Sequence, residues 1–343
     1  MRKLLNVLYV TSPDGYLARD GQNVVVRVAE EEKARVPIHI LESIVCFNYV
    51  GASPGVMSLC AESGVALCFL TESGKFLARV SGPTTGNVLL RRQQYRLADD
   101  VDRCAEVVKN IITAKIANSR NVLRRTLRDH GDTVNSQRLQ QAVEELDETL
   151  RLVVDNRDLD TLRGMEGRAA RVYFSVFDEL VLNSDPAFRF ESRTRRPPRD
   201  RVNALLSFVY ALLRHDVQSA LETVGLDPYV GFLHRDRPGR PSLALDLMEE
   251  LRPYLADRLV LSLINRKQVT PRGFVVSESE GVRMTDETRQ VVLGAWQQRK
   301  REEVVHPFLE ERIEIGLIPH AQALLLARYV RGDLEEYPPF FWR

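Results

Sequence analysis

The spacing of apolar residues changes once along the chain, at Gly82-Pro83, and this change constrains the fold most strongly. Before it, short runs rich in β-branched residues alternate with turn residues, a pattern typical of strands. From about residue 87 onward, apolar residues recur at helical spacing almost to the end. The sequence therefore predicts an α+β fold, with a small N-terminal β-sandwich at residues 1–84 and a larger all-α domain at residues 85–343.

Five runs in the first part are expected to form strands, and one helix interrupts them. Asp20-Gly21 and Glu72-Ser73-Gly74 supply hairpin turns between them. Ser53 as N-cap, Pro54 at the first helical position and Gly64 at the end predict the short helix. The five runs are LLNVLYV, VVVRV, ESIVCF, VALCFL and KFLARV.

The second part is expected to consist of long helices joined by short connections. Asp227-Pro228 resembles an N-cap followed by a first-turn proline, which predicts an additional short helix over residues 228–234. The stretch Arg189–Arg201 contains two prolines and is expected to be mobile. The long helices are predicted at about residues 87–129, 135–155, 166–182, 200–224, 242–264, 286–304 and 317–331.

Composition excludes several classes of protein. No apolar run reaches the roughly 18 residues that a membrane span needs, so a cytoplasmic protein without a membrane partner is expected. The four cysteines form no CxxC pair and are expected to be buried and reduced. The net charge of +1 conceals segregation: residues 91–128 hold ten Lys/Arg against four acids, and residues 141–160 hold seven acids against two Arg. Such separation favours binding of a polyanion to one face.

One histidine and several carboxylates are candidate catalytic residues. Glu166 lies on a helical face with apolar residues, and a carboxylate aimed at a core needs a proton, a cation or a metal. His234 precedes a helix carrying Asp246, Glu249 and Glu250, which are spaced to share one face. Each has an ordinary alternative: a first-turn acid, a hydrogen-bonded histidine or a solvated helix face. Together, they indicate a Mg²⁺ or Mn²⁺ site for phosphodiester chemistry.

These motifs resemble the integrase family of CRISPR adaptation, the "Cas one" proteins. The family pattern is a Glu in a glycine-flanked helix start, a later G-F-L-H, and a D-x-x-[DE] helix. Glu166, Gly231–His234, and Asp246 with Glu249 match it in order and spacing. The resemblance spans the chain and looks closest to the type I-C branch. It implies a metal-dependent DNA endonuclease and integrase that inserts short foreign DNA fragments as spacers into a CRISPR repeat array by transesterification.

The resemblance also implies residue roles and partners. Glu166, His234 and Glu249 would bind Mg²⁺ or Mn²⁺, and Asp246 would be a further catalytic ligand or would support the others. Other members often have Asp where this chain has Glu249, while Glu250 is expected to be dispensable. The implied partners are DNA, a second copy of the chain bound through residues 1–84, and the small adaptation protein "Cas two".

Two alternatives remain open from the sequence. A non-integrating metal-dependent nuclease for branched DNA would share the site, and only the presence of strand joining would distinguish the integrase from it. A non-catalytic nucleic-acid-binding scaffold would carry the acidic cluster as ordinary surface, and its behaviour would not depend on metal.

Overall fold

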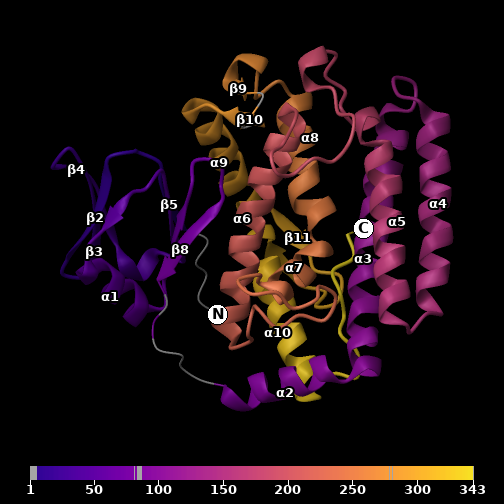
Figure 1. The fold of residues 1–343 in the computed structure, drawn as a ribbon, viewed down its shortest axis with the longest axis horizontal. Coiled ribbons are helices and arrows are strands. Elements are labelled where there is room, and N and C mark those ends of the chain that lie inside the picture. The colour runs from indigo at the N-terminus through magenta and orange to yellow at the C-terminus, as the bar shows by residue number, and fades with distance from the viewer. Residues whose placement is uncertain (1–5, 81, 83–86, 278, 280, 343) are drawn as a thin grey trace. The chain divides into compact units, whose positions relative to one another are not determined.

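In the computed structural model the chain divides into two compact units, Met1–Gly86 and Asn87–Arg343. The structure describes residues 6–80, 82, 87–277, 279 and 281–342. Leu4 and Leu5 of the first predicted strand, and Pro83 of the predicted change in spacing, lie outside the described residues. The first unit is built from strands and the second mainly from helices, which confirms the α+β fold (Figure 1).

The first unit contains two four-stranded sheets. One has the order β1 (Val7–Val10), β5 (Ser43–Phe47), β7 (Ala66–Leu70), β8 (Phe76–Val80), and the other has the order β4 (Glu31–Pro37), β3 (Asn23–Val28), β2 (Gly15–Asp20), β6 (Gly51–Ala52). The strands β1, β5 and β7 are parallel, whereas β8 returns antiparallel to β7. Strand β4 was not predicted because it is rich in charged residues and mostly exposed, and β2 was not predicted because only Gly15 and Leu17 of its six residues are buried.

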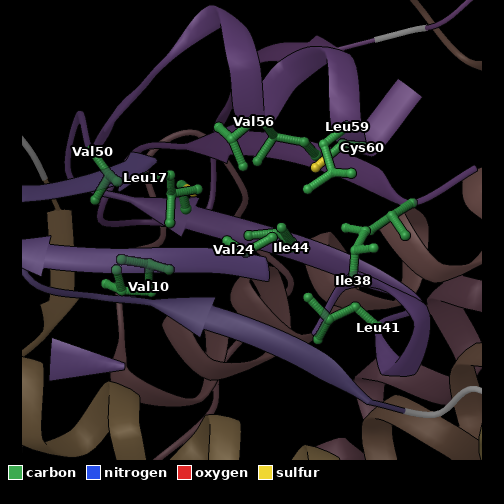
Figure 2. Packing of buried hydrophobic residues seen from close by; sticks show 14 residues of the cluster. Val10, Leu17, Val24, Ile38, Leu41, Ile44, Val50, Val56, Leu59 and Cys60 are labelled. Atoms are coloured by element: carbon green, nitrogen blue, oxygen red, sulfur yellow. The ribbon is translucent and has the colours of Figure 1, made fainter. Parts of the chain in front are cut away.

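Apolar side chains from both sheets and from helix α1 (Pro54–Ser63) form the core of this unit (Figure 2). Leu17, Val24 and Ile44 are each fully buried within it. The predicted helix signals are confirmed: the Ser53 hydroxyl accepts a hydrogen bond from the Val56 N–H at 3.2 Å, and the C-cap residue of α1 is a glycine with a φ of 67°. The β-sandwich prediction is therefore confirmed for the described residues.

The second unit is mainly helical, and its boundaries depart from the sequence prediction in four places. Asp100 divides the first long helix and caps the second half by accepting the Arg103 N–H at 3.2 Å. Helix α5 begins at Leu159 rather than near residue 166, and residues 228–234 are irregular rather than helical. Arg252–Asp257 is π-helical, which splits the helix predicted at 242–264. Two short hairpins, β9–β10 and β11–β12, make this unit less than all-α.

The elements of this unit are as follows: α2 (Val88–Asp99), α3 (Val101–His130), α4 (Ser136–Val154), α5 (Leu159–Ser175), α6 (Arg201–Val224), α7 (Ser242–Glu249), α8 (Arg258–Asn265), β9 (Phe274–Ser277), β10 (Gly281–Met284), α9 (Asp286–Arg301), β11 (Glu303–Val305), β12 (Arg312–Glu314) and α10 (Ile318–Arg331). Helices α3, α4 and α5 pack against one another (Figure 1). Among the described residues, no helix is long and apolar enough to cross a bilayer.

The packing of α3 and α5 against α4 pairs some of the basic residues with acids that are distant in the sequence. Arg120 of α3 forms an ion pair with Asp147 of α4, and Arg124 reaches the other carboxylate oxygen of Asp147 at 2.6 Å. Arg168 of α5 pairs with Glu148 of α4 at 3.3 Å. Basic and acidic stretches that are separate in sequence are therefore partners in the fold, and fewer cations of α3 remain available to a polyanion than the sequence suggested.

All four cysteines are buried and unbridged, as predicted. Burial raises the pKa of the Cys60 thiol to about 11 and that of Cys104 to about 12. These thiols are consequently protonated at neutral pH and are poor metal ligands.

Candidate metal centre

His234 lies in the irregular segment between α6 and α7, and Asp246 of α7 holds that segment in place. The buried Asp246 carboxylate accepts the backbone N–H groups of Phe232 at 2.6 Å, Leu233 at 2.9 Å and His234 at 2.9 Å. It also contacts the His234 ring Nδ1 at 2.6 Å. With Nδ1 donating its hydrogen to Asp246, Nε2 is left as the acceptor nitrogen.

The first residue of the G-F-L-H motif, Gly231, must be a glycine for a steric reason. A Cβ atom at Gly231 would come within 2.7 Å of Asp246 Oδ2 and within 2.8 Å of the Ser242 backbone. Both neighbours are fixed, because Asp246 is buried in its hydrogen bonds and Ser242 begins α7. A side chain at position 231 would therefore push the histidine loop away from the carboxylate.

Three further helices hold the same loop through its backbone. Gln94 of α2 donates to the carbonyls of Asp227 at 2.8 Å and Val230 at 2.9 Å, and accepts the Asp227 N–H at 2.9 Å. Cys104 of α3 contacts the Phe232 carbonyl at 3.3 Å, and Arg163 of α5 donates to the Leu233 carbonyl at 2.7 Å. These supporting residues were missed in the sequence because no local motif links them to the histidine.

Glu166 and Glu249 come together around Lys115 of α3, a cation that was not predicted from the sequence. The Lys115 ammonium forms an ion pair with Glu166 of α5 and lies 2.6 Å from Glu249 Oε2. His234 Nε2 lies 3.9 Å from Glu249 Oε1, which Arg252 also contacts at 2.8 Å. The side chains of Glu249 and Lys115 are 3% and 11% exposed, whereas those of Glu166 and His234 are 25% and 26% exposed.

The charges of this cluster balance. Burial opposes ionisation of Glu249, but the nearby Arg252 and Lys115 outweigh it and lower its pKa. Burial likewise disfavours the charged form of Lys115, yet Glu249 and Glu166 raise its pKa. At neutral pH two carboxylates thus face two cations inside the protein.

The donor chemistry of the cluster fits a hard divalent cation, since two carboxylates and one imidazole nitrogen are typical ligands of Mn²⁺ and acceptable ligands of Mg²⁺. The spacing does not yet fit. Among the described residues, no three His, Cys, Asp or Glu side chains stand close enough together to share an ion. Lys115 occupies the position between Glu166 and Glu249. The donor set therefore fits a divalent ion, whereas an ammonium fills the position between the two carboxylates.

Glu250 does not face the same neighbours as Asp246 and Glu249. Glu250 was expected to share their helix face and to be dispensable, and the predicted orientation is wrong. Its fully buried carboxylate accepts hydrogen bonds from Gln322 at 2.9 Å, the Tyr337 hydroxyl at 2.7 Å and the Phe340 N–H at 3.1 Å. Burial raises the pKa of Glu250 to about 7. The alternative of a solvated acidic helix face is also wrong, because all three carboxylates are buried.

In the stretch Arg189–Arg201, which was expected to be mobile, Arg193 faces inward. Arg193 donates to Asn203 Oδ1 at 2.7 Å and to Ser207 Oγ at 3.1 Å. Its guanidinium also lies 5.3 Å from the ring centre of Tyr210. The guanidinium of Arg252 lies 5.0 Å from the same ring centre. Arg193 is therefore a packing residue, whereas Arg195, Arg196 and Arg199 are exposed.

The relationship of this chain to known proteins follows from its sequence. The family described as "CRISPR associated protein Cas1" matches residues 8–298. The chain belongs to the Cas1 family. The "CRISPR-associated endonuclease Cas1 1" of Chlorobaculum tepidum is 52% identical over 343 residues, which cover 100% of both chains. The "CRISPR-associated endonuclease Cas1 2" of Rhodospirillum rubrum is 51% identical over 347 residues, again covering both chains completely.

Solved structures share the Cas1 fold seen here. A CAS1 protein from Thermotoga maritima superimposes with a TM-score of 0.82 at 23% identity, covering 97% of this chain and 99% of that one. A casposase bound to an integration product superimposes with a TM-score of 0.82 at 21% identity, covering 97% of this chain and 93% of that one. At these identities the likeness establishes the fold of the Cas1 chain.

Proposed function

We propose that this Cas1 protein is a metal-dependent DNA endonuclease and integrase that inserts short foreign DNA fragments as spacers into a CRISPR repeat array by transesterification. The observation that carries the proposal is that Glu166 and Glu249 share one buried ammonium, that of Lys115, while His234 Nε2 lies 3.9 Å from Glu249 Oε1. The names of the relatives support an endonuclease, and the casposase bound to its integration product supports strand joining on this fold.

In this proposal Glu166, His234 Nε2 and Glu249 hold the ion. Mg²⁺ or Mn²⁺ would supply Lewis acidity to a phosphodiester and lower the pKa of the attacking hydroxyl. Asp246 keeps the Nε2 lone pair of His234 directed toward Glu249 Oε1, and Arg252 contacts the same oxygen and fixes the carboxylate. The exposed Arg235 and Arg237 lie one and three residues after His234 and would steady the phosphate, with Arg235 paired to Asp160 at 3.0 Å.

We also propose the partners that the family resemblance implies. One solved relative with a TM-score of 0.85 at 20% identity over 98% of this chain is part of a complex of Cas6-RT-Cas1 with Cas2, which supports a Cas2-type partner. A complex of another relative with DNA supports a DNA substrate. Residues 1–84 would form the homodimer contact, residues 85–343 would carry catalysis, and the protein would act in the cytoplasm.

A strand-transfer assay tests this function. A supercoiled plasmid carrying the repeat is incubated with fragment DNA, a Cas2-type partner and Mg²⁺ or Mn²⁺. His234→Ala and Glu166→Ala are expected to abolish joining and cleavage, while DNA affinity measured without a divalent ion stays within a few fold. His130→Ala, at an exposed end of α3, is the matched control and should remain active. Full activity of His234→Ala would show that the site is misplaced.

The same assay separates the two alternatives. Metal-dependent cleavage of branched DNA without any joined product would identify a non-integrating nuclease. DNA binding that no divalent ion alters, with neither cleavage nor joining, would identify a scaffold.

A further inference from the structure

We propose that Lys115 is a built-in counter-ion, which holds the metal position in the metal-free protein and transfers to a DNA phosphate when a divalent ion binds. The inference rests on the proposed function, and it assigns a residue that couples metal binding to DNA binding. The net charge of the site would then depend on whether the divalent ion and the DNA are both bound.

The position of Lys115 carries the first step. Its ammonium bridges Glu166 of α5 and Glu249 of α7, the two carboxylates proposed as ligands. Lysine is rarely buried without partners, and here the partners are the groups that a metal would need. The ammonium and a divalent ion therefore compete for the same oxygens.

The charge balance carries the second step. Glu166 and Glu249 are already matched by Lys115 and Arg252. A divalent ion added to this set would leave excess positive charge at close range unless one cation withdrew. Arg252 is fixed against the Tyr210 ring at 5.0 Å, whereas Lys115 has a flexible four-carbon stem. Lys115 is the group free to move.

The destination of the ammonium carries the third step. A displaced charge in a buried site needs a new anionic partner. The cluster is more open at Glu166 and His234 than at Glu249, so an incoming phosphodiester approaches from that side. The phosphate would replace the carboxylates as the partner of Lys115. Metal and DNA would thus each strengthen the binding of the other.

Calorimetric titration of the full-length protein with Mn²⁺, with and without a short branched DNA, tests the coupling. DNA is expected to tighten Mn²⁺ binding to the wild type about tenfold. Lys115→Met should bind Mn²⁺ about tenfold tighter than the wild type without DNA, and should gain little from DNA. Lys109→Met, on the same helix, is the control and should match the wild type. Equal or weaker Mn²⁺ affinity of Lys115→Met without DNA would overturn the inference.

Because Lys115→Met leaves two carboxylates poorly compensated, a second measurement uses the wild type alone. Acetylation of lysines by an amine reagent is followed by mass spectrometry. Mn²⁺ should raise labelling of Lys115 several-fold relative to Lys109, and DNA should reverse the rise; unchanged labelling would overturn the inference even if the variant does not fold.

The result also separates this inference from the function on which it rests. Mn²⁺ binding that requires His234 but leaves Lys115 unlabelled would overturn the role of Lys115 alone. If the wild type bound no Mn²⁺ with or without DNA, both the metal centre and the role of Lys115 would be wrong.

Discussion

His234 presents its backbone N–H and its ring Nδ1 to one carboxylate, that of Asp246, at 2.9 Å and 2.6 Å. The same carboxylate accepts two further backbone N–H groups, from Phe232 and Leu233. Asp246 is thus fully engaged in shaping the loop and orienting the imidazole. We infer that it is a positioning residue rather than a metal ligand.

Asp246→Ala should destabilise the protein, since it would leave several buried donors without an acceptor. At 1–3 kcal/mol for each such group, a loss of about 3 kcal/mol or more is expected. His234→Ala removes a partly exposed side chain and should cost less than about 1 kcal/mol. Urea unfolding of both variants with EDTA present measures the difference. Equal stability of the two would mean that Asp246 does not organise the loop.

Glu250→Ala should be strongly destabilising, contrary to the expectation from sequence. The substitution leaves the donors of Gln322, Tyr337 and Phe340 without their shared acceptor, at a cost of about 2–4 kcal/mol. The C-terminal segment should become susceptible to protease. Limited proteolysis and urea unfolding measure both effects, with the exposed Glu335→Ala as control. Protease resistance like that of the wild type would contradict the anchoring role.

Asp257 should make stability depend on pH. Its buried carboxyl accepts the Tyr210 hydroxyl at 2.6 Å, and burial raises its pKa from 3.8 to about 6 despite that bond. Between these values the folded state retains a proton that the unfolded state has lost. This contribution is complete below about pH 4 and is lost as the pH rises through about 6, amounting to about 3 kcal/mol.

Asp257→Asn cannot titrate and should lack this pH dependence. Wild type and variant are unfolded in urea at several values between about pH 4 and 7, and the difference between their unfolding free energies is plotted. The wild type should lose stability relative to the variant as the pH rises. If the difference between the two unfolding free energies did not change with pH, the pKa of Asp257 would not be raised in the folded protein.

The exposed arginines of the 189–201 stretch should contact DNA phosphates. Arg195→Ala combined with Arg196→Ala should lower the dependence of log affinity on log salt by about 2, because two phosphate contacts are lost. The fold should be unaffected. Arg193→Ala should instead lower stability, since its guanidinium bonds Asn203 and Ser207. DNA titrations at several salt concentrations decide the point, and an unchanged slope in the double variant would remove this stretch from the interface.

The first unit should carry self-association. Strand β8 is an edge of its sheet and exposes Phe76 and Leu77. Edge strands with exposed apolar residues are ready to pair with another chain. Phe76→Lys with Leu77→Lys should therefore give a monomer in light scattering, whereas Glu31→Lys on the opposite sheet should not. A dimer that survives the double substitution would exclude this edge.

Local signals predicted local structure well. Ser53, Pro54 and Gly64 marked α1 because capping chemistry depends only on adjacent residues. The prediction of a short helix over residues 228–234 was wrong because Pro228 lies in a turn. In this turn the Tyr229 N–H donates to Asp227 Oδ1 at 2.8 Å. An aspartate followed by a proline can start a helix or form a turn. Here Gln94 of α2 bonds the backbone N–H and carbonyl of Asp227 and stabilises the turn.

The candidate ligands were predictable and the cation between them was overlooked. Lys115 nevertheless left a signal: it lies three and four residues from Ile111, Ile112, Asn118 and Ser119, all of which are buried. A lysine on such a face predicts a buried ion pair. The environment of Glu250 was predicted wrongly for a related reason: an amphipathic helix meets water on one side, whereas α7 is buried nearly all round.

The π-helical stretch Arg252–Asp257 lies between α7 and α8 and sets the rotation of one helix relative to the other about the chain direction. Before this stretch, Glu249 of α7 contacts Lys115, and at its end Asp257 accepts the Tyr210 hydroxyl. A π turn holds about one residue more than an α turn. Winding the same six residues as an ordinary α-helix would rotate everything beyond them by about 100° relative to Glu249. The π-helical winding therefore sets the angle between Glu249 and the residues that follow Asp257.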